Sequence, residues 1–181
     1  MRTFAQHIRA DLARHSRGFF SMSAWPVLVY RFGVWSLSLS RVPRFVTSKL
    51  YGIFLFSLDL FCATSIPRET TIGEDLLLPH VGSIKIHPDC VIGDRCCLFH
   101  EVTLGLSIDK EGAPTLGNDV FVGPGAKILG PVRIGDGARI AANSLVITDI
   151  PAGANAIGVP ARAFPAPRTP TPKARTIAPV P

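Results

Sequence analysis

The sequence predicts an all-β solenoid, a three-sided coil of short parallel strands, over most of its length. The first observation is a hexapeptide period, in which an aliphatic residue recurs at every sixth position: Ile86, Ile92, Leu98, Leu104, then Leu116, Val122, Ile128, Ile134, Ile140 and Val146. The second is a slot four residues later that holds a small or branched residue: Cys90, Cys96, Val102, Val120, Ala126, Val132, Ala138 and Ser144. With so short a period, each unit buries its apolar face only by stacking on the next.

Each hexapeptide supplies one strand and one turn, and three of them close one coil. Both repeated slots point inward, which explains why the second one is compact. Glycine follows many of the aliphatic residues. We expect these glycines to lie in turns that need unusual backbone angles, together with Asn118, Asp119, Asp136 and Asn143. The alternative, a β-sandwich, spaces its strands about eight to twelve residues apart and does not fit this period.

The period has two breaks. It begins near Ile66, keeps its step through Ile84 and then slips by two residues to Ile86. It breaks again after Gly105, where residues 106–115 lack repeat character and predict a loop that leaves one corner of the coil. Loops on a rigid scaffold often carry function, so both breaks are candidates for the site. The repeat is expected to close near Ile150.

Three regions follow from these patterns: a helical region at 1–64, the coil at 65–164 and a proline-rich, disordered tail at 165–181. Apolar residues at helical spacing predict one amphipathic helix, which includes Val27, Tyr30, Val34 and Leu37. Pro43 is expected to end that helix, and a second helix is expected from about residue 44 to residue 63.

Charge and cysteine content narrow the function. The net charge is +6, and residues 1–66 carry eight Arg and Lys against two Asp. These bases are interleaved with aromatic residues at helical spacing, without a nucleic-acid-binding motif, so no nucleic-acid partner is expected. The four cysteines show no disulfide or metal spacing. Together with a polar start that does not resemble a signal peptide, this predicts a cytoplasmic protein.

The sequence leaves open what the helical region contacts. Residues 19–39 are apolar apart from Arg31, but Pro26 interrupts them, and residues 50–63 are short for a membrane span. One alternative is a basic, aromatic-rich region that lies on a membrane surface as a peripheral contact. The other is a set of helices that pack on the coil or on a neighbouring subunit.

Two histidines form the candidate catalytic pair. His80 and His100 each lie two residues after an inward aliphatic, Leu78 and Leu98, in consecutive coils. Strands in one sheet lie about 4.8 Å apart, so the two rings are expected to be neighbours on the outside of the coil. A neutral imidazole is a natural base for taking a proton from a hydroxyl or an amine. Glu101 could orient a ring or bind an acceptor.

A zinc site is the rival interpretation of these residues. It would need more ligands, and Cys96 and Cys97 are near in sequence. Cys96 is expected to point inward, however, and no ligand pair has the usual spacing. No metal is therefore expected.

Residues 66–164 resemble the left-handed β-helix acyltransferases, and most closely the serine O-acetyltransferases. The segments that carry the resemblance are 101–105 (EVTLG), 122–130 (VGPGAKILG), 141–146 (AANSLV) and 158–162 (GVPAR). The resemblance implies a left-handed parallel β-helix, a homotrimer with active sites between subunits, and acetyl-CoA as the acetyl donor. The short helical N-terminal region is more similar to that of the colanic-acid and exopolysaccharide acetyltransferases.

Site residues carried over from the resemblance divide into two groups. The general base falls on His80, and the coenzyme A contacts fall on Gly105, Leu106, Ser107, Gly123, Pro124, Arg139 and Ala142. The serine-contacting acid falls on Pro79, the aspartate that orients the base on Ser65, and a second histidine on Ala113. The donor site thus resembles the family's, whereas the acceptor site departs from it.

The sequence therefore predicts an O-acetyltransferase whose acceptor is a saccharide hydroxyl in polysaccharide biosynthesis. One alternative is serine O-acetylation in cysteine biosynthesis, and another is a non-catalytic hexapeptide-repeat scaffold. The enzyme is expected in the cytoplasm, at the inner face of the membrane if the helical region touches lipid.

Overall fold

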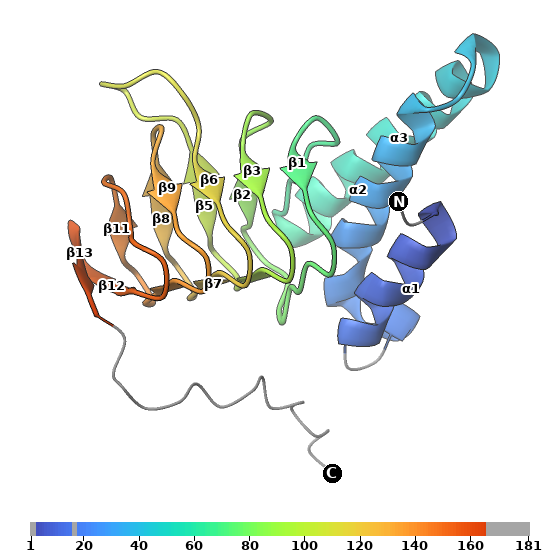
Figure 1. The fold of residues 1–181 in the computed structure, drawn as a ribbon. Coiled ribbons are helices and arrows are strands. Elements are labelled where there is room, and N and C mark those ends of the chain that lie inside the picture. The colour runs from blue at the N-terminus through green and yellow to red at the C-terminus, as the bar shows by residue number, and fades with distance from the viewer. Residues whose placement is uncertain (1–2, 16–17, 166–181) are drawn as a thin grey trace.

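The computed structural model describes residues 3–15 and 18–165, which form a group of helices followed by a three-sided coil of parallel strands (Figure 1). The predicted disordered tail lies outside the described residues, apart from its first residue. The last long helix ends at Cys62, and the first residue in a strand bridge is Ser65.

The N-terminal region is helical, as predicted. It contains α1 (Phe4–Arg14), the short helices η1 (Gly18–Phe20) and η2 (Met22–Ala24), α2 (Trp25–Leu37) and α3 (Arg41–Cys62). The expectation that a second helix begins after Pro43 was wrong, because α3 begins two residues before it. Proline is tolerated in the first turn of a helix, where its missing N–H would have no partner within the helix.

The strands form three sheets. Sheet 1 contains β1 (Thr71–Ile72), β3 (Val91–Ile92), β6 (Thr115–Leu116) and β9 (Arg133–Ile134). Sheet 2 contains β4 (Cys97–Leu98), β7 (Phe121–Val122), β10 (Arg139–Ile140), β12 (Asn155–Gly158) and β13 (Ala161–Phe164). Sheet 3 contains β2 (Lys85–Ile86), β5 (Thr103–Gly105), β8 (Lys127–Leu129) and β11 (Leu145–Val146). Every pair is parallel except β12–β13, so the chain visits the three sheets in turn.

The interior is built from the two repeated slots. The aliphatic residues of the first slot stack in register, as in the column that Leu98, Val122 and Ile140 form in sheet 2. The second slot is also buried, and the side chains of Cys96, Val102 and Ala126 have no exposed surface. The predicted inward direction of both slots is therefore confirmed.

The two-residue slip in the period does not lie between Ile84 and Ile86, where it was expected. Ile84 does not fill the first slot. Its carbonyl accepts from the N–H of Ser65, in the same way as the Val102 carbonyl accepts from Lys85, so Ile84 occupies the second slot. The two extra residues lie between Leu78 and Ile84, in the turn that contains His80. Gly82 and Ser83 in this turn have positive φ angles of 128° and 52°.

The glycines that follow the strands of sheet 1 have a different cause from the one expected. Gly117 does not have a positive φ; the left-handed residue of its turn is Asp119. A Cβ on Gly117 would lie 2.2 Å from Oδ1 of Asp136 in the next coil, and one on Gly93 would lie 2.5 Å from the carbonyl oxygen of Gly117. Glycine is needed here because successive coils approach closely.

Polar side chains close the same turns. Oδ1 of Asp94 accepts from the N–H of Glu74, Oδ1 of Asn118 accepts from Asp94, and Oδ1 of Asp136 accepts from Asn118, at 2.7, 2.8 and 2.6 Å. We call this corner, between sheets 1 and 2, the glycine corner. Its repeated hydrogen bonds link each coil to the next.

The coil closes later than predicted. Beyond Ile150 the chain makes another passage through sheet 2, where β12 pairs with β10. The segment from Gly158 to Arg162 turns back, so that β13 pairs antiparallel with β12. A hairpin therefore covers the last coil.

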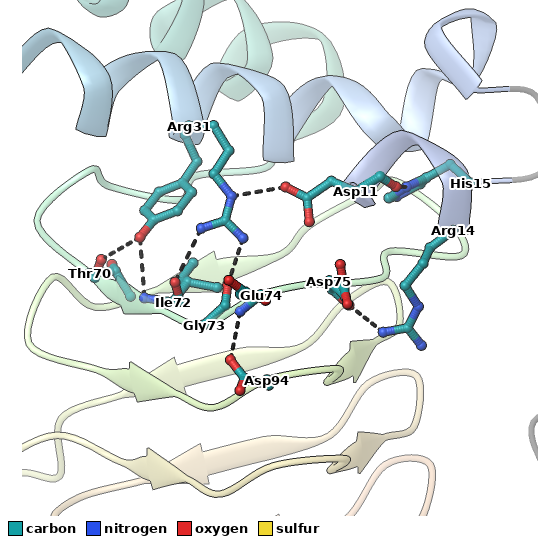
Figure 2. Close-up of polar contacts among 11 residues, drawn as sticks. Asp11, Arg14, His15, Arg31, Thr70, Ile72, Gly73, Glu74, Asp75 and Asp94 are labelled. Carbon is teal, nitrogen blue, oxygen red and sulfur yellow. Dashed lines mark hydrogen bonds and ion pairs between the residues drawn. The ribbon is translucent and has the colours of Figure 1, made fainter. Parts of the chain in front are cut away.

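A buried polar network joins the helices to the first coil (Figure 2). Nε of Arg31 donates to Asp11 at 2.9 Å, and its two terminal nitrogens donate to the carbonyls of Ile72 and Gly73. The Tyr30 hydroxyl donates to the carbonyl of Thr70. Because these partners lie in α1, α2 and β1, the network fixes α1 and α2 against the start of the coil.

Candidate active site

The site is built on the corner between sheets 2 and 3, which we call the histidine corner. The turns that follow Leu78, Leu98, Val122 and Ile140 stack there in consecutive coils, because these residues are in register in sheet 2. The residue two positions later in each turn is His80, His100, Pro124 or Ala142, respectively. The lengthened turn belongs to the coil that carries His80.

The predicted proximity of the two histidines is confirmed. The ring centroids of His80 and His100 are 5.8 Å apart, and the ring planes meet at 75°. His80 is exposed, whereas His100 is partly covered and its Nδ1 is buried without a hydrogen-bond partner among the described residues. His80 is therefore the more accessible ring of the pair.

An aromatic side chain packs against both His80 and His100. The Phe99 ring lies 6.0 Å from His80 and 6.5 Å from His100, and it contacts Phe121 at 5.3 Å. The Arg139 guanidinium lies 4.5 Å from the centroid of the Phe121 ring. These ring contacts connect the histidines to Arg139, the cation that the resemblance assigns to coenzyme A.

Backbone hydrogen bonds support the turn of His100. Its carbonyl accepts from the N–H of Gly125 at 3.0 Å, and the N–H of Glu101 donates to the carbonyl of Gly82 at 2.8 Å. Glu101 has a φ of 61°, and its carbonyl accepts from Nζ of Lys127. Within residues 3–15 and 18–165 the Glu101 carboxylate bonds to neither imidazole, so the expected orienting role has no support in this chain.

The coenzyme A candidates fall at two corners. Gly123, Pro124 and Ala142 lie at the histidine corner, and Arg139 lies on the strand just before it. Gly105 ends β5, and Leu106 and Ser107 begin the loop at the next corner, between sheets 3 and 1. Sheet 3 separates the two groups within one chain, so a single chain does not bring all of these residues together.

The predicted loop after Gly105 is present and projects from the coil between β5 and β6 (Figure 1). Its base is anchored, because the carbonyl of Gly105 accepts from the N–H of Gly130 and Ser107 lies against Gly130. Gly130 has a φ of 83°, and a Cβ there would lie 3.1 Å from the Cβ of Ser107.

His15 is a buried residue that was not among the predicted site residues. It is 4% exposed, and its Nδ1–H donates to the carbonyl of Asp11 at 2.7 Å (Figure 2). Its Nε2 accepts from the N–H of Leu78 at 3.4 Å. Burial lowers the pKa of His15 below 6.5, and the bond to Asp11 opposes this effect only in part. A neutral His15 therefore holds the backbone two residues before His80. Arg31, an isolated charge in an apolar stretch, was the available signal for this network.

The cysteines contribute to packing rather than to the site. Burial raises the pKa of Cys90, Cys96 and Cys97 to about 11, so these thiols stay protonated at neutral pH. Cys96 points inward as expected. In the part of the chain that the structure describes, no group of three or more His, Cys, Asp or Glu side chains is arranged to hold a metal ion.

The acceptor side is uncharged at the three positions that depart from the resemblance. Ser65 lies at the start of the coil, bridged to Lys85, and Pro79 precedes His80 in the lengthened turn. Ala113 lies at the end of the projecting loop and packs against the core. Among the described residues, His80 forms no ion pair with a carboxylate.

Comparisons with known proteins agree with this fold. Residues 113–148 match the family model described as bacterial transferase hexapeptide (six repeats). The serine acetyltransferase of Helicobacter pylori is 37% identical over 134 residues, which cover 73% of this chain and 70% of the relative. That of Synechococcus elongatus is 38% identical over 105 residues, covering 57% of this chain and 43% of the relative.

A solved structure gives the same result for the fold. The serine acetyltransferase of Brucella abortus in complex with coenzyme A superposes with a TM-score of 0.78 at 23% sequence identity, over 90% of this chain and 68% of that one. The chain is an acyltransferase and belongs to the serine acetyltransferase family of hexapeptide-repeat proteins.

Proposed function

We propose that this protein is an acetyl-CoA-dependent O-acetyltransferase in which His80 acts as the general base. The observation that carries the proposal is the pair of His80 and His100, whose ring centroids are 5.8 Å apart on adjacent turns of the histidine corner. The names of the relatives support the reaction class, and the coenzyme A complex of the Brucella abortus protein supports the donor.

In the proposed reaction, His80 takes the proton of the acceptor hydroxyl while the oxygen attacks the carbonyl carbon of the thioester. The tetrahedral intermediate collapses with cleavage of the C–S bond, and the proton passes from the imidazolium to the leaving sulfur. A backbone N–H near Gly105 would stabilise the negative oxygen of the intermediate. Positioned base catalysis of this kind contributes roughly 10²–10⁴-fold in rate.

The site proposed here needs more than one copy of the chain. The coenzyme A candidates at Gly105, Leu106 and Ser107 lie one corner away from His80, with sheet 3 between them. Packing the face of one coil against another would bring the two corners together. We therefore infer a homotrimer with shared sites, built on a left-handed parallel β-helix, as the resemblance implies.

L-Serine is the first acceptor to test, because the relatives from Helicobacter pylori and Synechococcus elongatus are serine acetyltransferases. The comparisons do not support the saccharide expected from the sequence. The test is thiol release from acetyl-CoA by the purified full-length protein, with and without L-serine. Serine-dependent release supports the proposal, and release that serine does not change argues against this acceptor.

A saccharide hydroxyl remains the second candidate on one specific observation. Ser65, Pro79 and Ala113 provide no charge where a serine carboxylate and amino group would need partners. Acetyl transfer to oligosaccharides, but not to serine, would favour this candidate. Binding of coenzyme A without turnover on either acceptor would favour the scaffold alternative. The proposed location is the cytoplasm, at the inner face of a membrane.

A further inference from the structure

The exposed face of α3 carries an apolar stripe along the whole helix. We define the α3 stripe as Val42, Phe45, Val46, Ile53, Phe56 and Leu60, which are spaced at helical intervals and are between 55% and 79% exposed. Within this chain the coil and α2 cover little of α3, in which Tyr51 is the one buried residue, so packing on a neighbouring subunit and contact with a membrane surface both stay open for this face. A row of large apolar side chains on one helix face indicates a surface that another apolar phase covers.

The opposite face of α3 is fixed to the rest of the protein. The Tyr51 hydroxyl accepts from the N–H of Arg68, and the Tyr51 ring leaves no room for a Cβ on Gly33 of α2. Asp59 forms an ion pair with Lys85 of the coil. With 22 residues and a mean hydropathy of 1.5 in its most apolar window, α3 is long and apolar enough to span a bilayer. These contacts hold it beside α2 and the coil instead, which favours a helix that lies on a surface.

Charge identifies the kind of surface. Arg41, Arg44 and Lys49 are exposed near the start of α3, and the helix has no acidic residue in its first turn. Positive charges at a helix N-terminus oppose the helix dipole, so Arg41 and Arg44 do not serve helix stability. The acids of residues 1–66, Asp11 and Asp59, are both paired with cations. Among the residues that the structure describes, Arg41, Arg44 and Lys49 form no ion pair.

A second apolar feature adjoins the stripe. A groove of about 310 Å³ lies between α3 and the segment that leads into α2, lined almost entirely by apolar side chains, among them Met22, Trp25, Phe54 and Phe61. Phe20, at the end of η1, is 88% exposed nearby in the sequence. The turn between α2 and α3, at the other end of the hairpin from this groove, projects away from the coil (Figure 1).

We propose that α3 docks in the plane of an anionic lipid membrane. The α3 stripe enters the boundary between headgroups and acyl chains, and Arg41, Arg44 and Lys49 contact lipid phosphates. Lys49 suits both zones, because its ammonium lies over the Phe45 ring, 5.6 Å from the centroid, and its stem can extend along the apolar surface. The coil, with the histidine corner, then stays in water beside the membrane.

The test is co-sedimentation of the full-length protein with vesicles of phosphatidylcholine, with and without phosphatidylglycerol. We expect binding to the anionic vesicles that weakens as salt rises. Replacing Arg41, Arg44 and Lys49 together by Gln should lower the partition coefficient by about fivefold per charge. The double variant Ile53→Ser and Phe56→Ser should lower it by at least about tenfold.

The matched control is Ile157→Ser, which removes a side chain that is 54% exposed at the far end of the coil and should bind like the parent protein. Thermal unfolding checks that every variant is folded. Absence of binding to anionic vesicles, or binding that neither α3 variant changes, overturns the proposal. So does a fall in particle mass by light scattering in the Ile53→Ser, Phe56→Ser variant, which would assign the stripe to contact between copies.

Release from cell membranes by alkaline carbonate is the expected behaviour of a surface-bound helix, and resistance to it would indicate a span instead. Vesicle binding is measured without acetyl-CoA or acceptor. Absence of vesicle binding would therefore not bear on the proposed acetyl transfer, and absence of acetyl transfer would not bear on the proposed membrane contact.

Discussion

Two corners of the same coil follow different rules. At the glycine corner, each turn repeats the last, with a glycine pressed against the next coil and an Asp or Asn that bonds to the neighbouring backbone. At the histidine corner, the turns differ in length, and successive coils present His80, His100, Pro124 and Ala142 in one column. The regular corner holds the coils together, whereas the irregular one is free to vary in chemistry.

The largest expected effect is on the histidine corner. His80→Ala should lower the turnover of acetyl-CoA by roughly 10²–10⁴-fold, because it removes the base while the interior slots remain intact. Steady-state assays of thiol release measure this loss. Unchanged turnover would remove His80 from the mechanism, and an unchanged thermal unfolding curve would show that the fold has been kept.

A substitution at the glycine corner should lower the stability of the protein and leave its turnover nearly unchanged. In Gly117→Ala the new Cβ would lie 2.2 Å from Oδ1 of Asp136, which must move and lose its bond to Asn118. We expect a loss of about 1–3 kcal/mol in the free energy of unfolding, measured by denaturant titration, and little change in turnover per folded chain.

Gly52→Ala is the matched control for that substitution. Gly52 lies inside α3 with open space around its Cα, so alanine there should stabilise the protein by about 0.5–1 kcal/mol. Equal losses from both substitutions would mean that the close approach of the coils is not the reason for glycine at position 117.

A smaller effect is expected from His100. Its Nδ1 is buried without a partner among the described residues, and its ring contacts His80 edge to face. If His100 positions His80, His100→Gln should lower kcat by about tenfold and leave KM for acetyl-CoA nearly unchanged, since a loss of about 1.4 kcal/mol in the transition state corresponds to that factor. A rise in KM alone would indicate a binding role instead.

The smallest effect concerns pH. His15 has a pKa below 6.5 in the folded protein, so below that pH the unfolded chain binds more protons and the free energy of unfolding falls. One such group changes stability by at most about 1.4 kcal/mol per pH unit. Comparing unfolding curves of the parent protein and His15→Asn from pH 8 to pH 5 should show a flatter profile in the variant, and parallel profiles would contradict this account.

Features that the local repeat determines could be predicted from the sequence. The period alone gave the three-sided coil, because burial in a repeated slot is a local rule that the sequence records at every step. The pairing of His80 with His100 could be predicted as well, since counting in register places them in adjacent turns. Placing Ile84 in the first slot was wrong, because a residue two positions off the period can still be buried.

Features that depend on contacts between distant segments were not predictable. The need for glycine at position 117 arises from the next coil, and the role of His15 arises from a helix that packs beneath Leu78. A helical region on a membrane surface was one of the alternatives, but the α3 stripe itself could not be identified, because the sequence shows where a helix is apolar and not which of its faces a neighbour covers.

The central claim is that the two corners separate chemistry from folding. Its most direct test is the initial rate of thiol release per folded chain, measured side by side for His80→Ala and Gly117→Ala with the acceptor identified for the parent protein. We expect a rate reduced by roughly 10²–10⁴-fold for His80→Ala and a rate close to that of the parent for Gly117→Ala. Equal reductions in the two variants, or a larger one in Gly117→Ala, would contradict it.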